Sequence, residues 1–422
     1  MTHQPQLTGT DRDDILSLPW GIPLEEWPAS VLVALPQGIS RHTVRFAQVG
    51  DDVVAVKETT SEMATREFDL LRQLRKRGVP AVKGIAVVTD RRDSSGDDLP
   101  SALITKHLRF SMPYRAVFSK TLRPDTATRF VDAMAVLLAR LHLSGFYWGD
   151  VSLSNVLFRR DAGSFAAYLV DAETGELING ELSSGQRAND LEIARVNIAG
   201  ELLDLLAGAR LDPSIDPVTL AAKFVTSYES LWAELTEWQT MDSTETWKIA
   251  ERVERLNALG FDLGEISLST DLPGNAVKVR PKVVDAGHHT RRLIRLTGID
   301  AEENQARRLL NALDEYSARS RKDDQWDEGR AAHEWLVSEF EPTIDSIPED
   351  LRGKLDAPQV FHEVLEHKWY LARQRERDVP LAEAAAAYFS DILRHRRDEE
   401  VLVSPPTTTI SLPVITDWRD LV

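Results

Sequence analysis

Three side chains set around two short apolar runs have the types and spacing that phosphate chemistry needs. Asp150 precedes Asn155 by five residues and the apolar run 156–158 follows at once, while a second apolar run, 167–170, ends at Asp171. Magnesium takes few protein oxygens and completes its shell with water and phosphate, so Asn155 and Asp171 suit it. Asp150 would accept the proton of an attacking hydroxyl. The pattern favours phosphoryl transfer. The plainer interpretation is an ordinary Asp in a loop after a helix.

Two helices must position this loop. Apolar residues at helical spacing predict a helix over 126–143, which Gly145 ends and which leads into the loop. His142, at the end of that helix, is interpreted as a packed residue and not as a catalytic one. A second helix is predicted over 189–206, with Asp190 at its start as a cap for the backbone of the catalytic loop.

The first part of the chain predicts a small antiparallel sheet. Residues 1 to about 25 are expected to be a loosely packed lead-in. The turn between the first two strands contains Gly38 and Ser40, whose backbone amides and hydroxyl would cover phosphates; a plain hairpin turn is the alternative. Lys57 lies at the end of the third strand. The expected strands are 30–35, 43–46, 53–57, 84–89 and 102–105.

A helix expected over 61–77 carries Glu67, ten residues after Lys57. A helical acid at this distance would pair with the lysine and aim its ammonium at the phosphates. Glu62 on the same helix is the alternative partner, and a solvated face that includes both acids is the plainer interpretation.

With Lys57, Glu67, Asp150, Asn155 and Asp171 in this order, the first half of the chain resembles the protein-kinase-like superfamily. It is nearest the lipopolysaccharide-kinase-like branch, as in actinobacterial proteins that pair such a domain with a C-terminal domain of unknown function. The resemblance implies an α+β, two-lobed fold, with a small antiparallel sheet lobe and a helical lobe. It also implies ATP and Mg²⁺ as cofactors.

The resemblance implies a role for each matched residue. Asp150 would be catalytic, and Asn155 and Asp171 would bind the metal. The nucleotide-binding residues would be Lys57, Glu67, Gly38 and Ser40. The acid two residues after Asp171 resembles small-molecule kinases of the aminoglycoside and choline type, and Ser152 stands where protein kinases usually have Lys. Both features favour a small-molecule, lipid or sugar acceptor over a protein.

The second half predicts a different organisation. We expect the kinase-like domain over 26–212, a mainly α-helical domain with a short β-hairpin over 213–400, and an extended or disordered tail over 401–422. A basic cluster lies within residues 278–308 and includes a helix, a turn with Gly298 and a further helix. Such a pair can read nucleic acid. A plain αα-hairpin is favoured because the rest of the chain is acidic.

The composition limits the binding partners and the cellular compartments that the protein is expected to have. The chain has 422 residues, a formal charge of −17 and no cysteine. Its charge disfavours general nucleic-acid and anionic-membrane binding, and the missing cysteine excludes disulfides. No stretch approaches the ~20 apolar residues that span a bilayer, so no membrane insertion is expected. The polar first residues do not resemble a signal peptide. We expect a cytoplasmic protein.

The sequence therefore predicts an ATP- and Mg²⁺-dependent phosphotransferase with an unidentified hydroxyl acceptor. One alternative is a nucleotide-binding pseudokinase whose C-terminal helical domain engages a protein partner, so the enzymatic activity itself is left open. A second alternative is a nucleic-acid-associated protein that uses the basic stretch 278–308.

Overall fold

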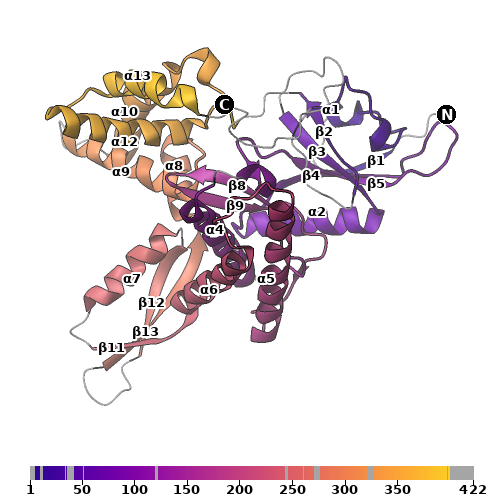
Figure 1. Ribbon diagram of the computed structural model, residues 1–422, viewed down its shortest axis with the longest axis horizontal. Coiled ribbons are helices and arrows are strands. Elements are labelled where there is room, and N and C mark those ends of the chain that lie inside the picture. Colours follow the sequence, from indigo (N-terminus) through magenta and orange to yellow (C-terminus); the bar gives the residue numbers. More distant parts are fainter. Residues whose placement is uncertain are drawn as a thin grey trace. The chain divides into compact units, whose positions relative to one another are not determined.

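The computed structural model divides into two compact units (Figure 1). The N-terminal unit comprises residues 1–158 and 167–225, and the C-terminal unit comprises residues 159–166 and 226–400. The structure describes residues 5–9, 13–33, 35, 42–50, 52–118, 122–242, 246–259, 261–269, 276–320, 327–396 and 398–399. The expected tail, 401–422, lies outside these ranges.

A five-stranded antiparallel sheet forms the first lobe of the N-terminal unit, with strand order β1-β4-β5-β3-β2. Helix α2 (Ser61–Lys76) follows the third strand, and the Thr60 hydroxyl caps it by accepting a hydrogen bond from the amide of Met63. Phe68 and Leu71 lie on its buried face. The strands are β1 (Gln6–Gly9), β2 (Val44–Val49), β3 (Asp52–Thr59), β4 (Lys83–Thr89) and β5 (Ser101–Lys106).

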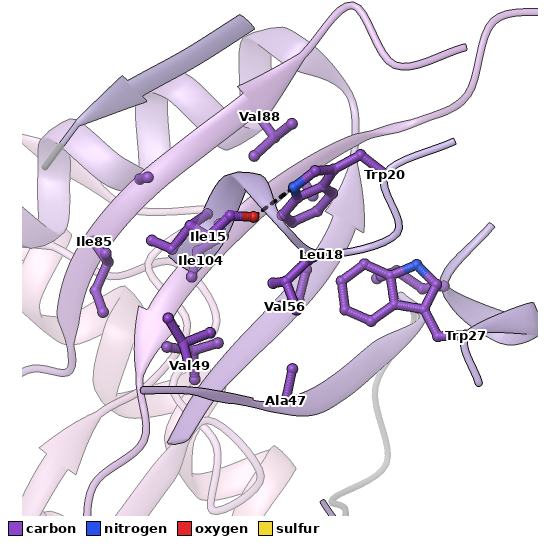
Figure 2. Packing of buried hydrophobic residues seen from close by; sticks show 14 residues of the cluster. Ile15, Leu18, Trp20, Trp27, Ala47, Val49, Val56, Ile85, Val88 and Ile104 are labelled. Atoms are coloured by element: carbon purple, nitrogen blue, oxygen red, sulfur yellow. Dashed lines mark hydrogen bonds between the residues drawn. The ribbon is translucent and has the colours of Figure 1, made fainter. Parts of the chain in front are cut away.

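The expectation of a loosely packed lead-in is wrong. Strand β1 pairs with β4 at the edge of the sheet, and the segments α1 (Asp13–Leu16) and η1 (Leu24–Glu26) follow it. Trp20 and Trp27 are each only 4% exposed and pack against the sheet's Val56 and Ala47 (Figure 2). The ring nitrogen of Trp20 donates to the carbonyl of Ile15 at 2.7 Å. Widely spaced large apolar residues in a polar segment carry no periodic signal, yet each buries a large area.

The strand expected over 30–35 is also corrected. Only Leu32 forms a bridge, to Ala47, and residue 34 lies outside the described ranges. The amides of Val31 and Leu32 donate to the carbonyls of a preceding turn, at Pro28 and Ala29. Those donors are therefore unavailable to a regular ladder.

The second lobe is built around two long helices, α4 (Pro124–Leu143) and α5 (Ser184–Ala207). Gly145 ends α4 with φ +80°, and a Cβ there would lie 2.9 Å from two backbone oxygens, so a glycine is required. The buried face of α4 carries the apolar residues that the sequence indicated, including Phe130 and Met134. The remaining elements are α3 (Tyr114–Val117), β6 (Met112–Pro113), β7 (Phe146–Tyr147), β8 (Val156–Asp161), β9 (Ser164–Leu169), β10 (Glu176–Leu177) and α6 (Pro217–Thr236).

The C-terminal unit is mainly helical, with a three-stranded sheet of order β11-β13-β12. Strands β12 and β13 form the expected hairpin, and β11 adds a strand that the sequence did not indicate. Trp335, Phe340 and Phe361 lie together at the centre of the helical core. The strands are β11 (Gln239–Asp242), β12 (Phe261–Ser269) and β13 (Ala276–Ala286). The helices are α7 (Thr246–Ala258), α8 (His288–Thr297), α9 (Glu303–Ser320), α10 (Glu328–Trp335), η2 (Leu336–Phe340), α11 (Glu341–Asp345), η3 (Glu349–Leu351), α12 (Ala357–Arg375), α13 (Leu381–Asp391) and η4 (Leu393–His395).

The chain therefore combines a small antiparallel sheet lobe and a helical lobe with a mainly helical C-terminal unit, as the sequence predicted. None of the helices within the described ranges has both the length and the apolar character needed to cross a bilayer.

A buried acid links helices α8 and α9 and makes the C-terminal unit sensitive to acid. Glu303 accepts hydrogen bonds from the amides of His289 and Thr290, at the start of α8. Burial raises the pKa of Glu303, but the hydrogen bonds from His289 and Thr290 outweigh burial and lower the pKa to about 2. A carboxyl whose pKa is lowered in the folded state stabilises that state above its ordinary pKa. This stability is lost as the pH falls from about 4.5 to about 2.

We expect Glu303→Gln to lower the free energy of unfolding of the C-terminal unit at pH 7 by about 3 kcal/mol, the equivalent of this pKa shift. The variant should also lose most of the decrease in stability below pH 4.5. Urea unfolding at pH 7 and pH 3 measures both effects. Glu315→Gln, at an exposed position on the same helix, is the control and should change neither value. An unchanged acid sensitivity in Glu303→Gln would contradict this role.

Candidate active site

Helix α5 holds the loop that carries Asp150. The carboxylate of Asp190 accepts hydrogen bonds from the amides of Trp148 at 2.9 Å and Gly149 at 2.8 Å. The ring of His142 contacts the same carboxylate at 3.0 Å and is fully buried. Asp190 thus caps the loop as expected, and His142 is a packed helix-end residue. Burial lowers the pKa of His142.

Two further residues of α5, which the sequence did not single out, hold the rest of the loop. Glu201 accepts hydrogen bonds from the amides of Leu153 at 2.7 Å and Ser154 at 2.9 Å, and burial raises its pKa. The side-chain amide of Asn197 donates to the carbonyl of Val151 at 3.1 Å and approaches Oδ1 of Asp150 at 3.4 Å. Asp190, Asn197 and Glu201 are seven and four residues apart, which places them on one helix face. Polar residues at this spacing within an apolar helix were the available signal.

Asp150 and Asn155 lie in direct contact. The side-chain nitrogen of Asn155 donates to the backbone oxygen of Asp150 at 3.1 Å and to its Oδ2 at 3.2 Å. Since the nitrogen faces Asp150, the Oδ1 of Asn155 is the atom that can face a cation. The backbone oxygen of Asn155 accepts a hydrogen bond from the amide of Val170 at 3.0 Å. This bond brings the chain next to Asp171.

Lys57, at the end of β3, lies among three carboxylates. Its ammonium is 2.7 Å from Oε2 of Glu67, 3.0 Å from Oε2 of Glu173 and 3.2 Å from Oδ2 of Asp171. Glu67 is only 1% exposed, and its other oxygen accepts a hydrogen bond from the amide of Ala172 at 3.2 Å. Glu62, the alternative partner, is exposed in the first turn of α2. The structure thus brings together Lys57, Glu67 and Asp171.

The charges in this cluster shift one another's pKa values. Burial lowers the pKa of Lys57, but attraction to Glu67 and Asp171 outweighs it and leaves the pKa above its ordinary value. Burial and then the charge of Asp171 raise the pKa of Glu67 to about 7, against the opposing effect of Lys57. The two shifts do not mirror each other because one ammonium is shared among three acids. Lys57 therefore stays charged at neutral pH.

Glu173 is the one acid of these three that the predicted site did not include. Single oxygens of Glu67, Asp171 and Glu173 lie within 4.8 Å of one another, a grouping able to hold a cation. Glu173 also contacts the ring of His42 at 3.0 Å. The signal was the Asp-Ala-Glu sequence at 171–173, whereas nothing in the sequence indicated His42. Hard oxygen ligands such as these carboxylates suit magnesium.

The other two predicted nucleotide-binding residues, Gly38 and Ser40, lie outside the described residues. Strand β5 ends at Lys106, and the amide of the next residue, His107, donates to the carbonyl of Val53 at 2.9 Å. The roles predicted for Gly38 and Ser40 stay predictions.

The fold and the arrangement of these residues resemble those of a kinase-like domain. Its features are a five-stranded antiparallel sheet with Lys57 on an inner strand, a helix that places Glu67 against it, and a helical lobe that presents Asp150, Asn155 and Asp171.

Two family models match separate parts of the chain. Residues 46–195 match the lipopolysaccharide kinase (Kdo/WaaP) family, and residues 230–393 match a domain of unknown function, DUF4032. The chain thus contains a segment similar to the Kdo/WaaP kinases, followed by a segment similar to DUF4032. The first match contains all five of the residues that carried the resemblance.

Solved structures that align with the chain include WaaP in complex with acyl carrier protein, at 15% identity and a TM-score of 0.35. That alignment covers 60% of this chain and 99% of WaaP. An aminoglycoside-3'-phosphotransferase of type VIII aligns at 16% identity and a TM-score of 0.31, over 49% of this chain and 88% of its own. No curated protein matches the chain significantly in sequence.

The contact between Lys57 and Glu67 predicts that their variants act non-additively. We expect Lys57→Met and Glu67→Gln each to weaken binding of magnesium–ATP, and the double variant to lose less than the sum, with a coupling of about 1–3 kcal/mol. The reason is that both residues act through one ammonium position, where they lie 2.7 Å apart. Isothermal titration calorimetry with magnesium–ATP on the parent, the two single variants and the double variant gives the coupling free energy. Glu62→Gln, at the exposed acid of the same helix, is the matched control, and its effect should add to that of Lys57→Met. Strict additivity for Glu67 would exclude it as the partner.

Proposed function

We propose that the N-terminal unit transfers the γ-phosphoryl group of ATP to the hydroxyl of a small molecule, a lipid or a sugar, with magnesium as the metal. The observation that carries this proposal is the buried Lys57–Glu67 pair beside Asp171. Burying a charged pair is costly, and a structural role alone would be served as well by apolar side chains. The charged lysine suits the phosphates of a nucleotide, and the acids around it suit the metal that the nucleotide carries.

Each residue has a defined task in this reaction. Asn155 and Asp171 would hold magnesium, with Glu173 as a further candidate ligand, and the metal would neutralise charge on the phosphates. Lys57 would leave Asp171 and Glu173 for the phosphate oxygens and keep its contact with Glu67. Asp150 would orient the acceptor hydroxyl and take its proton as the hydroxyl oxygen bonds to the γ-phosphorus and the bond from that phosphorus to the leaving ADP breaks. Because the loop amides are bound to α5, Asp150 is positioned before substrate arrives.

A nucleotide-binding pseudokinase is the second candidate, favoured by one observation. Lys57 is bound by Asp171 and Glu173 in addition to Glu67, so nucleotide must displace two ion pairs before the lysine can reach it. A site that used this rearrangement only to bind nucleotide would act as a switch. Turnover separates the two candidates.

A screen of the purified full chain tests the proposal. ATP consumption would be measured with magnesium, and with EDTA as the blank, over sugar, lipid-headgroup, nucleoside, aminoglycoside and protein acceptors. The expected result is magnesium-dependent turnover with one class of non-protein hydroxyl compound. Magnesium–ATP binding without turnover over all classes would favour the pseudokinase. A chain that binds no nucleotide would overturn both candidates.

We infer a cytoplasmic location from the same chemistry. ATP and magnesium, which the proposed reaction requires, are abundant there. Fractionation of cells that produce the full chain would test this inference. Recovery outside the cytoplasm would contradict it.

A further inference from the structure

The β8–β9 hairpin belongs to both units of the chain. Strand β8 starts one residue after Asn155, and β9 ends two residues before Asp171. The two strands are neighbours in one sheet. The base of the hairpin lies in the N-terminal unit, whereas its tip, residues 159–166, lies in the C-terminal unit. Contacts at the tip are therefore contacts inside the C-terminal unit, and the segment that makes them runs directly into both proposed metal ligands.

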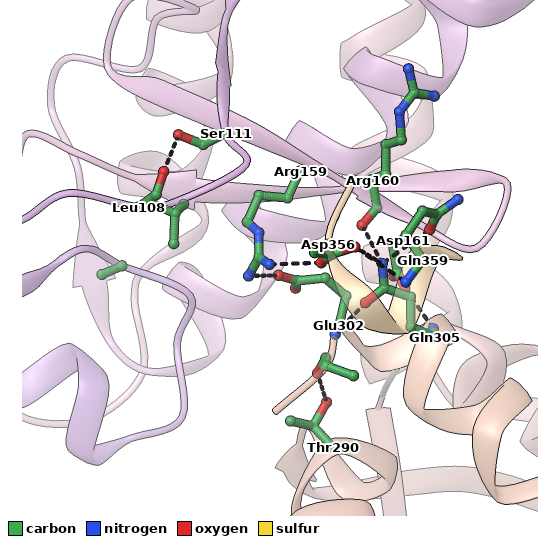
Figure 3. A network of polar contacts seen from close by, with 12 residues as sticks. Leu108, Ser111, Arg159, Arg160, Asp161, Thr290, Glu302, Gln305, Asp356 and Gln359 are labelled. Atoms are coloured by element: carbon green, nitrogen blue, oxygen red, sulfur yellow. Dashed lines mark hydrogen bonds and ion pairs between the residues drawn. The ribbon is translucent and has the colours of Figure 1, made fainter. Parts of the chain in front are cut away.

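Arg159 anchors one side of the tip. Its guanidinium contacts Glu302 at 2.6 Å and Asp356 at 2.8 Å (Figure 3). The three side chains are only 18%, 8% and 11% exposed, so water screens these charges weakly. Asp356 also caps helix α12, through a hydrogen bond from the amide of Gln359. One arginine thus joins the hairpin to the segments that precede α9 and α12.

Asp161, two residues further along β8, is a second anchor of the tip. It is 4% exposed and accepts hydrogen bonds from the amide of Gln305 at 2.8 Å and the side-chain nitrogen of Asn304 at 2.9 Å. Gln305 lies in the first turn of α9, where backbone amides have no partner within the helix. The hairpin therefore supplies a cap for a helix that begins more than 140 residues later. Burial raises the pKa of Asp161, against the effect of these donors.

The backbone of the tip is held as well. The side chain of Gln305 donates to the carbonyl of Arg160 at 3.0 Å, and the amide of Ala162 donates to Oε1 of Gln359 at 3.1 Å. The two glutamines are joined by a further bond of 3.0 Å. Arg160 adds an ion pair with Glu399 at 2.7 Å. Side chains and backbone of residues 159–162 are thus fixed, which restrains the position of the hairpin tip.

The proposed metal ligands lie at the base of the β8–β9 hairpin, opposite its tip. The hairpin is closed at its base by the bond from the amide of Val170 to the carbonyl of Asn155. At about 3.3 Å per residue, Arg159 is only about 13 Å along the strand from Asn155. A paired hairpin of this length bends little, so a displacement of its tip changes the placement of its base.

We propose that the C-terminal unit positions Asn155 and Asp171 for magnesium by holding the tip of the β8–β9 hairpin, with Arg159 and Asp161 as positioning residues. This role rests on the proposed function of the N-terminal unit. It gives the DUF4032 segment a task in phosphoryl transfer although neither Arg159 nor Asp161 contacts the reacting atoms.

Two variants of the full chain test this role. Asp161→Asn offers one acceptor oxygen where the carboxylate offers two, so one of the donors from Gln305 and Asn304 loses its partner. Arg159→Lys keeps the charge, but a single ammonium cannot bridge Glu302 and Asp356 as the guanidinium does. The measured quantity is the magnesium concentration that gives half-maximal binding of a fluorescent ATP analogue. We expect it to rise about tenfold in each variant, the lower end of the effect of losing a residue that supports a metal ligand.

Two controls separate positioning from general destabilisation. Leu313→Ala removes a fully buried side chain from the core of the same unit, and should lower the unfolding temperature without changing the magnesium requirement. Arg330→Lys makes the same chemical change as Arg159→Lys at a largely exposed pair with Glu334, and should change neither property. If Asp161→Asn does not fold, Arg159→Lys alone decides the result.

The outcomes are distinct. A raised magnesium requirement in the hairpin variants but not in Leu313→Ala supports the role. An unchanged requirement in folded hairpin variants, or an equal rise in Leu313→Ala, overturns it while leaving the proposed function intact. If the unaltered chain shows no magnesium-dependent nucleotide binding, the proposed function itself is overturned, and the positioning role is overturned with it.

Discussion

Replacing Asp150 by asparagine is expected to slow phosphoryl transfer by about 10²–10⁴-fold while leaving magnesium–ATP binding at the parent level. The asparagine keeps the size of the side chain and one acceptor oxygen, so it can keep a hydrogen bond from one of Asn155 and Asn197, which lie 3.2 and 3.4 Å from the Asp150 carboxylate. It cannot accept the proton of the acceptor hydroxyl. The loss should therefore appear in kcat and not in the nucleotide dissociation constant.

Single-turnover kinetics with the acceptor found in the screen measures this loss, and calorimetry measures ATP binding. Asp125→Asn, at an exposed position in the first turn of α4, is the control and should transfer at the parent rate. Transfer by Asp150→Asn at the parent rate would refute the role of Asp150 as base. Equal binding with no turnover in either form, over the full acceptor screen, would favour the pseudokinase.

Replacing Asp171 by alanine is expected to abolish the stabilisation of the N-terminal unit by magnesium–ATP. At a hundredfold excess over its dissociation constant, a ligand stabilises the parent by about 2.7 kcal/mol. We expect a value near zero for the variant, since Asp171 is the acid that would hold the metal against the phosphates. The side chain is 31% exposed at the end of a loop, so its loss should leave the folded state intact.

Thermal denaturation of both forms, with and without magnesium–ATP, provides the measurement. Glu181→Gln, which removes one negative charge at an exposed loop position of the same unit, should keep the full ligand effect. Equal stabilisation of Asp171→Ala and parent would show that the metal is held elsewhere. Glu173 would then be the first residue to replace, because its carboxylate lies in the same acidic cluster.

The sequence predicted the fold well, and placed the candidate site residues on their elements, because both depend on local patterns. Lys57 falls at the end of a strand with alternating burial, and Glu67 falls on the buried stripe of the helix that follows. The catalytic loop lies between a helix with a clear apolar stripe and a short apolar strand. The geometry of Lys57 and Glu67 agrees with the predicted pairing, and their roles in nucleotide binding stay predictions.

The parts that the sequence missed depend on contacts between distant residues. Trp20 and Trp27 reach the sheet core from a segment that has no periodic pattern. Glu173 meets His42 across more than 130 residues, and Asp161 meets Gln305 across more than 140. Such pairs leave no spacing signal, because either partner alone looks like an ordinary polar surface residue. Only the Asp-Ala-Glu sequence gave any local indication of Glu173.

The path of the chain through the hairpin also affects how the two units can be recombined into other genes during evolution. Many two-domain proteins are joined by a single linker, so one recombination event can transfer either half to a new gene. Here the chain passes from one unit to the other at 158/159, returns at 166/167 and passes again at 225/226. A gene fragment cut at the last of these points would encode a kinase-like domain with Arg159 and Asp161 stripped of their partners. We therefore expect the kinase-like segment and the DUF4032 segment to be transferred between genomes together and rarely apart.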